Sequence, residues 1–220
     1  MGKSAGNASD PLELAEKYGV DQLRYFLLRE VSFGQDGTYS EEAIVTRCNA
    51  ELANSFGNLA QRVLSLIVKN CDRYLPAISG HDDQDSALFE LVGQAVSRDI
   101  PEAFTELALG RGVETWMNAV FACNAYVDAQ APWALRKTDI PRMETVLATL
   151  YICIAQLAVA IHPIIPDATS MLLDTMGLDG PLRTYEGVQT HWYSPLAESD
   201  YRLAPPTPIF PRLEMPSEAD

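Results

Sequence analysis

The sequence has few cysteines and places none of them where a metal site or a dense disulfide framework would need them. Its four cysteines, Cys48, Cys71, Cys123 and Cys153, are far apart, with no C-x-x-C pair. No histidine stands at zinc-ligand spacing, and none of the three histidines has a glutamate three residues before it, as di-metal helical bundles require. The pattern argues against a metal enzyme and predicts reduced, partly buried thiols.

Alternating β-strand patterns, an apolar leader and a membrane span are also missing. The first residues, M-G-K-S-A-G-N, have no apolar signal region. The apolar run from Val146 to Ile161 is interrupted by Gln156 and is short for a bilayer, so we expect it to form a buried helix. The sequence therefore predicts a cytoplasmic protein with no membrane partner.

Positive charge is scarce: 16 basic residues face 30 acidic ones, giving a net charge of -14 and a pI of about 4.5. This balance removes the general attraction that most nucleic-acid binders have for phosphate. The bases are concentrated, however. Residues 47–73 hold four bases against two acids, and residues 130–143 hold three bases against one acid, so each segment is net +2. If the two segments lie side by side, an acidic protein still offers a basic groove.

With 220 residues and 47% hydrophobic content, the chain can bury a sizeable core. Capping patterns predict helix starts at Asp10-Pro11, Asp21 and Ser40, with Gly19 as a stop. The periodicity predicts an all-α fold, an antiparallel bundle of about five main helices. Apolar positions expected to line these helices include Leu88, Leu91, Leu107, Val113, Trp116, Met117, Val120, Phe121, Tyr126, Met171, Leu172 and Met176.

We expect three parts along the chain: connecting helices in 1–30, the main helical domain in 31–176, and an irregular C-terminal arm in 177–220. The arm is dense in Pro and Gly and has no helical period, but it contains Trp192, Tyr193 and Phe210. These aromatic residues predict an ordered arm packed on the surface of the bundle.

The stretch from Arg47 to Asn70 is the most informative part of the sequence. A row of Asn54, Asn58 and Arg62, spaced by four residues, stands on a different helix face from an apolar stripe. Amides and guanidinium forks suit the flat edge of a nucleobase. The alternative is a helix flank that bonds to a neighbouring loop. The apolar stripe consists of Leu52, Phe56, Leu59, Val63, Leu66 and Ile67.

Several segments together resemble the methionyl-tRNA synthetases, class I aminoacyl-tRNA synthetases. They are K-S-A-G-N, D-P-L-E-L-A-E-K-Y-G-V-D-Q-L-R, R-C-N-A-E-L-A-N-S-F-G-N-L-A-Q-R, N-A-Y-V-D-A-Q-A-P-W and I-F-P-R-L-E, in chain order. The similarity runs from the end of the KMSKS signature through the anticodon-binding domain and covers nearly the whole chain. The A-P-W and F-P-R elements favour the methionine enzyme over related synthetases.

The resemblance implies that Asn58 and Arg62 hydrogen-bond anticodon bases and that Trp133 stacks on one. The residues fit these roles, since a Trp placed just after a helix-ending Pro is held at an edge. Arg136 and Lys137, beside it, can meet phosphates, and Asn54 is a weaker candidate on the same row. Trp116 lies inside an apolar stripe, and we expect it to be core.

Lys3 and Ser4 match the end of the KMSKS loop, which implies a contact with ATP phosphates. The first lysine of that motif and the HIGH motif are absent, as is a nucleotide-binding α/β fold. We therefore expect the C-terminal part of a longer synthetase, inactive by itself and without a cofactor of its own. In this part alone, Lys3 would be an exposed lysine with nothing to bind.

The family implies a full enzyme that uses ATP and Mg²⁺ and works through a separate N-terminal catalytic domain. The implied partner is the CAU anticodon loop of methionine tRNA, and neither DNA nor a membrane is expected. The competing hypothesis is a non-enzymatic helical protein-interaction module that uses the acidic surface and the aromatic tail. It predicts no dependence on the nucleotide sequence of any RNA.

Overall fold

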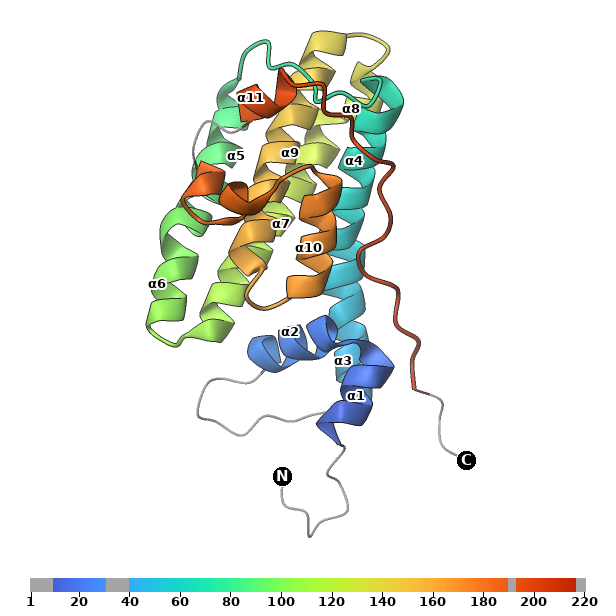
Figure 1. Ribbon diagram of the computed structural model, residues 1–220, viewed down its shortest axis with the longest axis vertical. Coiled ribbons are helices and arrows are strands. Elements are labelled where there is room, and N and C mark those ends of the chain that lie inside the picture. The colour runs from blue at the N-terminus through green and yellow to red at the C-terminus, as the bar shows by residue number, and fades with distance from the viewer. Residues whose placement is uncertain (1–9, 31–39, 190–192, 217–220) are drawn as a thin grey trace.

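The computed structural model describes residues 10–30, 40–189 and 193–216, and every regular element in these ranges is helical (Figure 1). This confirms the all-α class. The α-helices are α1 (Pro11–Tyr18), α2 (Val20–Glu30), α3 (Glu41–Arg47), α4 (Asn58–Asn70), α5 (Asp83–Gln94), α6 (Ile100–Thr105), α7 (Leu109–Gln130), α8 (Pro132–Leu135), α9 (Ile140–Ile161), α10 (Pro166–Thr175) and α11 (Tyr193–Ala197). Two π-helices, η2 (Cys48–Gly57) and η3 (Ala95–Asp99), and two 3₁₀ turns, η4 (Gly180–Arg183) and η5 (Gly187–Gln189), complete the described elements.

The long helices form an antiparallel bundle in which α4 and α7 run one way and α5 and α9 run the other (Figure 1). The short α8 caps one end of the bundle, and α1 and α2 lie at the opposite end. The centre is α9, which contacts α4, α5, α7, α8 and α10. Within the described ranges it is the one helix long and apolar enough to cross a membrane, but 83% of its apolar window is buried by protein. It is the core helix that the sequence predicted.

The expected start signals cap the helices. Asp10 accepts a hydrogen bond from the Leu12 amide at 2.9 Å, and Ser40 accepts one from Ala43 at 3.1 Å. Gly19 follows α1 with φ +94°, in the region that favours glycine. These local interactions fix where α1 and α3 begin.

The prediction that Asp21 caps its own helix is wrong. Helix α2 begins at Val20, so Asp21 lies within its first turn. Its buried carboxylate instead accepts a hydrogen bond from the amide of Ala168, at 2.8 Å, in the first turn of α10. Arg24, one turn along α2, donates to the carbonyl oxygens of Pro163 and Ile164. The start of α2 is thus bound to the turn that precedes α10 and to the start of α10, 140 residues away in the sequence.

A π-helix forms the first part of the stretch from Arg47 to Asn70. It runs over Cys48–Gly57 and continues directly into α4. A Cβ at Gly57 would lie 3.0 Å from the Leu52 carbonyl oxygen of the same π-helix, a tight contact, and 3.4 Å from the Phe210 ring of the C-terminal arm, an ordinary one. Wide helical turns of this kind are frequent at functional sites.

The apolar core contains most of the predicted stripe of the central helix, since Leu52, Phe56, Leu59, Val63 and Ile67 are fully buried and Leu66 is partly buried against them. The predicted thiols are free: Cys48, Cys123 and Cys153 are buried and Cys71 is partly buried. Burial raises the pKa of Cys48 to about 12, which makes its thiol unreactive. Four side chains expected to line the core are instead exposed, namely Leu91, Leu107, Phe121 and Met171.

Leu107 is exposed because it lies between two helices and not inside one. The chain turns at Leu107, which has φ +58°, and α7 begins only at Leu109. The role of Gly112 is close packing: a Cβ there would lie 2.4 Å from the Phe104 ring of α6.

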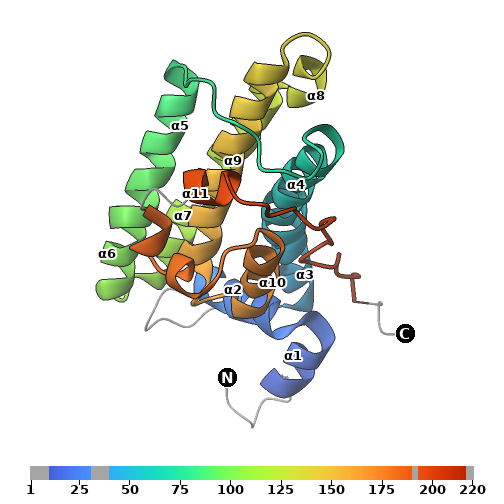
Figure 2. The same ribbon diagram turned by 45° about the horizontal axis from the view of Figure 1, so that its top comes forward.

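The described part of the C-terminal arm is ordered and packed, as expected, although it includes the short helices η4, η5 and α11. Leu203 and Phe210 are buried, and Tyr193 donates to the Pro76 carbonyl at 2.6 Å. From residue 203 the arm runs along α4 and the π-helix (Figures 1 and 2). Asn49 fixes its end by exchanging two hydrogen bonds with the Leu213 backbone, at 2.8 and 2.9 Å. Trp192 lies outside the described residues, and the three-part division of the chain stays a prediction.

The close approach of α6 and α7 predicts opposite effects for two glycine substitutions. Gly112→Ala should destabilise the protein by about 1–3 kcal/mol, because the new methyl group overpacks against Phe104. Gly93→Ala is the control: this helical glycine of α5 has open space around it, and alanine should stabilise by about 0.5–1 kcal/mol. Chemical denaturation measures both. Equal effects of the two substitutions would contradict this packing account.

Candidate nucleic-acid interface

The polar row predicted on the central helix lies on the surface. Burial of the apolar stripe turns Asn54, in the π-helix, and Asn58, at the start of α4, outward, and both are exposed. Neither amide has a hydrogen-bond partner in the part of the chain that the structure describes. Asn49 and Asn70 are different, since each binds backbone. The amides of Asn54 and Asn58 are therefore available to a ligand.

Arg62 lies one helical turn beyond Asn58 and meets Trp133 of α8. Its guanidinium carbon lies 5.5 Å from the centroid of the Trp133 ring, a cation–π distance. Its Nη1 donates to Asp128 of α7 at 3.0 Å in an exposed hydrogen bond, while Nε and Nη2 are buried and have no hydrogen-bond partner within the described ranges. The structure thus brings together two predicted site residues that are 71 positions apart in the sequence, and leaves one of them with unused donors.

The end of α7 sets the position of Trp133. Pro132 disfavours helical geometry at the preceding residue, as predicted, and Ala131 adopts a left-handed conformation with φ +46° and ψ +57°. Pro132 is buried, whereas the Trp133 side chain, immediately after it, is 40% exposed. A large aromatic ring is thus held at the end of the bundle with a surface open to solvent.

Trp116 has the opposite environment, which confirms its predicted place in the core. It is fully buried, donates from Nε1 to the Leu157 carbonyl at 2.9 Å, and packs edge-on against Phe56 with the ring centroids 5.0 Å apart. The indole N–H, its one hydrogen-bond donor, is therefore satisfied inside the protein. Of the two described tryptophans, only Trp133 is placed to meet a ligand.

Two of the three bases in the segment 130–143 are free cations, and they are the two predicted beside Trp133. Arg136 and Lys137, in the turn after α8, are exposed, and neither is in an ion pair among the described residues. Arg142, which the charge count placed in the same basic segment, pairs instead with the buried Asp85 and with Asp82. The local positive charge is therefore smaller than the sequence suggested.

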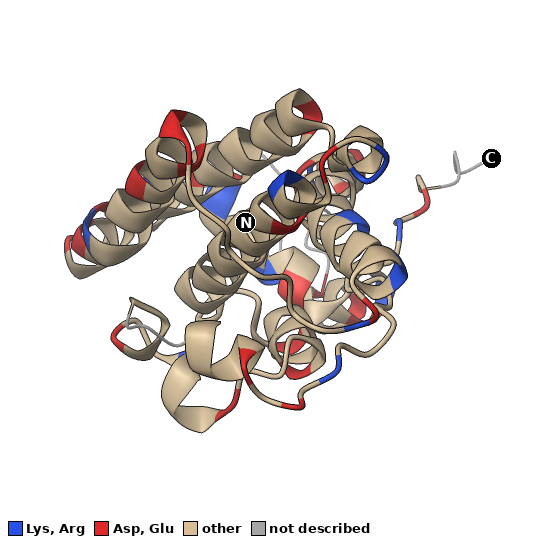
Figure 3. Cartoon of the chain, turned by 90° about the horizontal axis from the view of Figure 1, so that it is seen from above, with Lys and Arg blue, Asp and Glu red and all other residues tan. Residues whose placement is uncertain are grey.

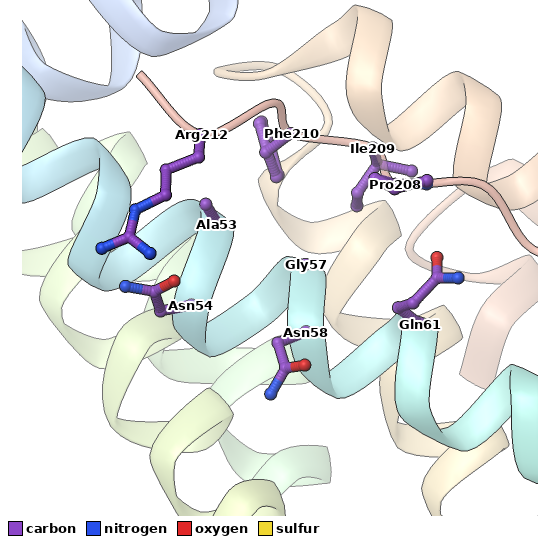
Figure 4. A pocket seen from close by; sticks show the side chains of 9 residues that line it. All are labelled: Ala53, Asn54, Gly57, Asn58, Gln61, Pro208, Ile209, Phe210 and Arg212. Atoms are coloured by element: carbon purple, nitrogen blue, oxygen red, sulfur yellow. The ribbon is translucent and has the colours of Figure 1, made fainter. Parts of the chain in front are cut away.

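A groove on the other side of the polar row was missed by sequence reasoning. It has a volume of about 420 Å³ and lies between the central helix and the C-terminal arm (Figure 4). The helix contributes Asn54, Asn58 and Gln61, and the arm contributes Arg212. No acidic side chain lines the groove. The arm lies 150 residues after Asn58 in the sequence, so only folding shows that the two meet, although the F-P-R element of the arm was noticed as a family marker.

Charge is divided between two sides of the bundle. Seen from above, basic positions gather toward the side that carries the C-terminal arm, and acidic positions dominate the opposite helices (Figure 3). The two net-positive segments do approach each other, as the contact between Arg62 and Trp133 demonstrates. An anionic ligand would therefore be repelled least near the polar row.

Two further predictions concern catalysis and metals. Lys3 and Ser4, the match to the KMSKS loop, lie outside the described residues. Within the ranges that are described, no cluster of three or more His, Cys, Asp or Glu side chains is arranged to hold a metal ion.

Two family models match the sequence. The model described as tRNA synthetases class I (M) matches residues 1–64, and the model described as the anticodon binding domain of methionyl tRNA ligase matches residues 75–207. The second match alone covers more than half of the chain.

Curated proteins and solved structures agree with these matches. A methionine–tRNA ligase from Brucella suis is 44% identical over 212 residues, which is 96% of this chain and 40% of that protein. One from Mycobacterium tuberculosis is 40% identical over 220 residues, covering 98% of this chain and 41% of that protein. The crystal structure of Mycobacterium tuberculosis methionyl-tRNA synthetase bound by methionyl-adenylate superposes with a TM-score of 0.89 at 40% identity, covering 96% of this chain and 41% of that chain.

The chain spans about 40% of the length of these relatives. The sequence and fold of the chain agree with those of these relatives along nearly all of its own length. The chain belongs to the methionyl-tRNA ligase family, as its anticodon-binding domain.

Proposed function

We propose that this domain recognises the CAU anticodon loop of methionine tRNA and thereby selects the tRNA for a methionine–tRNA ligase. The observation that carries the proposal is the exposed Trp133 ring facing Arg62, whose hydrogen bond to Asp128 is open to solvent. Single-stranded RNA is read by stacking unpaired bases on aromatic rings and by bonding their edges. A rigid ring beside a guanidinium and a free amide provides both contacts.

In this proposal, an anticodon base that has left the loop stack lies on the open surface of Trp133. Arg62 and Asn58 bond the edge of that base, which fixes its identity. Asn54, farther along the row, is assigned a supporting contact with the strand. The side chain of Asp128 is 64% exposed, so its pair with Arg62 contributes only about 0–1 kcal/mol and a base edge can compete for the guanidinium.

Arg136 and Lys137 are assigned to backbone phosphates. Both are exposed and adjoin α8, so they can reach a strand that crosses Trp133 without giving up a protein partner. The net charge of -14 makes such local cations important, because the protein as a whole repels RNA. Binding should therefore be confined to this end of the polar row.

The wider setting follows from the family. We infer that a separate catalytic domain attaches methionine in a reaction that uses ATP and Mg²⁺, in the cytoplasm, and that Lys3 and Ser4 belong to its ATP-binding loop. No DNA or membrane partner is proposed. The second hypothesis, a helical protein-interaction module, is not favoured, because it gives no reason for an open tryptophan that meets Arg62 at the end of a row with two unpaired amides.

Arg62→Ala tests whether the guanidinium reads a base. The variant should weaken binding of a stem-loop with a CAU anticodon by about 1–3 kcal/mol, the range for loss of a base-edge contact, and should weaken mismatched loops less. Fluorescence anisotropy titrations at fixed salt provide the measurement.

Two controls accompany Arg62→Ala. Lys137→Ala removes a phosphate contact and should weaken all loops equally. Arg98→Ala removes an exposed charge from η3, whose neighbouring helices carry the acidic side of the bundle, and should change little. If Arg62→Ala behaves like Lys137→Ala, Arg62 contributes charge and not recognition.

Trp133→Ala separates a stacking platform from a core residue. The free variant should keep its melting temperature nearly unchanged, because the ring is 40% exposed, while binding of the CAU loop falls by about 1–3 kcal/mol. Trp133→Phe should keep part of the affinity. Trp116→Ala is the matched control and should cost about 3–5 kcal/mol of stability. A large drop in melting temperature for Trp133→Ala, with unchanged affinity of the folded protein, would refute the platform role.

A further inference from the structure

A buried carboxylate lies beneath the turn that carries Trp133. Asp85, in the first turn of α5, is fully buried and accepts two hydrogen bonds from the Arg142 guanidinium of α9, at 2.5 and 2.9 Å. Tyr126 of α7 donates its hydroxyl to the same carboxylate. Burial opposes ionisation of Asp85, but the hydrogen bonds from Arg142 and Tyr126 prevail and hold its pKa below the usual value. Helices α5, α7 and α9 therefore meet at one charged centre.

This centre extends to the last residue of α7. Arg142 Nη2 donates to the side-chain oxygen of Gln130 at 2.8 Å. The side-chain nitrogen of Gln130 donates in turn to the side-chain oxygen of Gln84, on α5, at 2.8 Å. Gln130 is thus bound on both sides at the position where α7 ends.

The three residues after Gln130 connect its position to that of the Trp133 ring. Ala131 holds a left-handed conformation that non-glycine residues adopt only where their surroundings enforce it, Pro132 is buried, and Trp133 follows. Only Ala131 and Pro132 separate Gln130 from Trp133. A shift of the last residue of α7 would therefore also shift the Trp133 ring.

We propose that Gln130 is a positioning residue for RNA binding: through Arg142 and Gln84 it locks the α7–α8 turn so that Trp133 faces Arg62 before RNA arrives. The inference rests on the proposed function. A ring that is already held in place in the free protein loses less conformational entropy when RNA binds. A locked ring therefore binds more tightly than a mobile one. Gln130 itself makes no contact with RNA in this account.

The network provides a way to separate positioning from stability. Removing Arg142 would leave the buried Asp85 carboxylate without its ion-pair partner and is expected to destabilise the protein strongly. The bond between Gln130 and Gln84 is neutral and exposed, so its loss should leave the melting temperature almost unchanged. Gln84→Ala breaks this bond alone, whereas Gln130→Ala breaks it and also removes the acceptor of Arg142 Nη2.

The test is a double-mutant cycle with Trp133, using the full chain and the CAU stem-loop as the probe. In the protein that retains Trp133, Gln130→Ala should weaken binding roughly 3- to 30-fold, and Gln84→Ala should act in the same direction. In the Trp133→Ala background, neither substitution should change the affinity. Gln94→Ala, on α5, removes a similar exposed hydrogen bond to Asp99 and should have no effect in either background.

The outcomes distinguish this proposal from the proposed function. If Trp133→Ala weakens binding but Gln130→Ala does not, or if Gln130→Ala weakens binding equally in both backgrounds, the positioning role is wrong and the platform stands. If Trp133→Ala binds the loop as tightly as the unmodified protein, the platform itself is wrong, and the positioning role fails with it.

Discussion

Burial of one face of the central helix is the constraint on which the rest of the structure depends. Leu52, Phe56 and Val63 pack into the core around α7 and α9, and this fixes the rotation of the π-helix and α4 about their common axis. The polar row of Asn54, Asn58 and Arg62 is on another face of the same helix, so it must lie at the surface. The outward position of this face, which we propose reads bases, is therefore a consequence of core packing, and the face is as rigid as the core that turns it outward.

Electrostatics confine this function to a small area. The chain carries a net charge of -14, and several of its cations are already paired, Arg142 with Asp85 and Arg47 with Glu51 and Glu30. Among the described residues, Arg136 and Lys137 near Trp133 and Arg212 on the arm are exposed and take part in no ion pair. In the proposed function, an RNA strand would thus be repelled by most of the surface and bind in one place, which favours recognition by contacts to bases over binding by charge alone.

Much of this arrangement could be predicted from the sequence, because it follows from local rules. The caps at Asp10 and Ser40, the buried helix α9 and the outward row of Asn58 and Arg62 all depend on spacing within one helix. The parts that were missed depend on partners distant in the sequence. Asp21 was assigned to its own helix but caps α10, Arg142 was counted as free charge but is paired with Asp85, and the groove needs an arm that returns from the end of the chain. Leu107 failed for a local reason, since no glycine marks its left-handed turn.

The central claim is that an exposed ring and a polar row on a rigid helix read the sequence of an RNA loop. The most direct measurement is a titration of the unmodified chain with anticodon stem-loops that are identical except in the three anticodon positions, at one fixed salt concentration. The account predicts that the CAU loop binds at least roughly tenfold more tightly than loops changed at one position, about 1.4 kcal/mol per altered base. Equal affinity for all loops, or no binding to any, would contradict it.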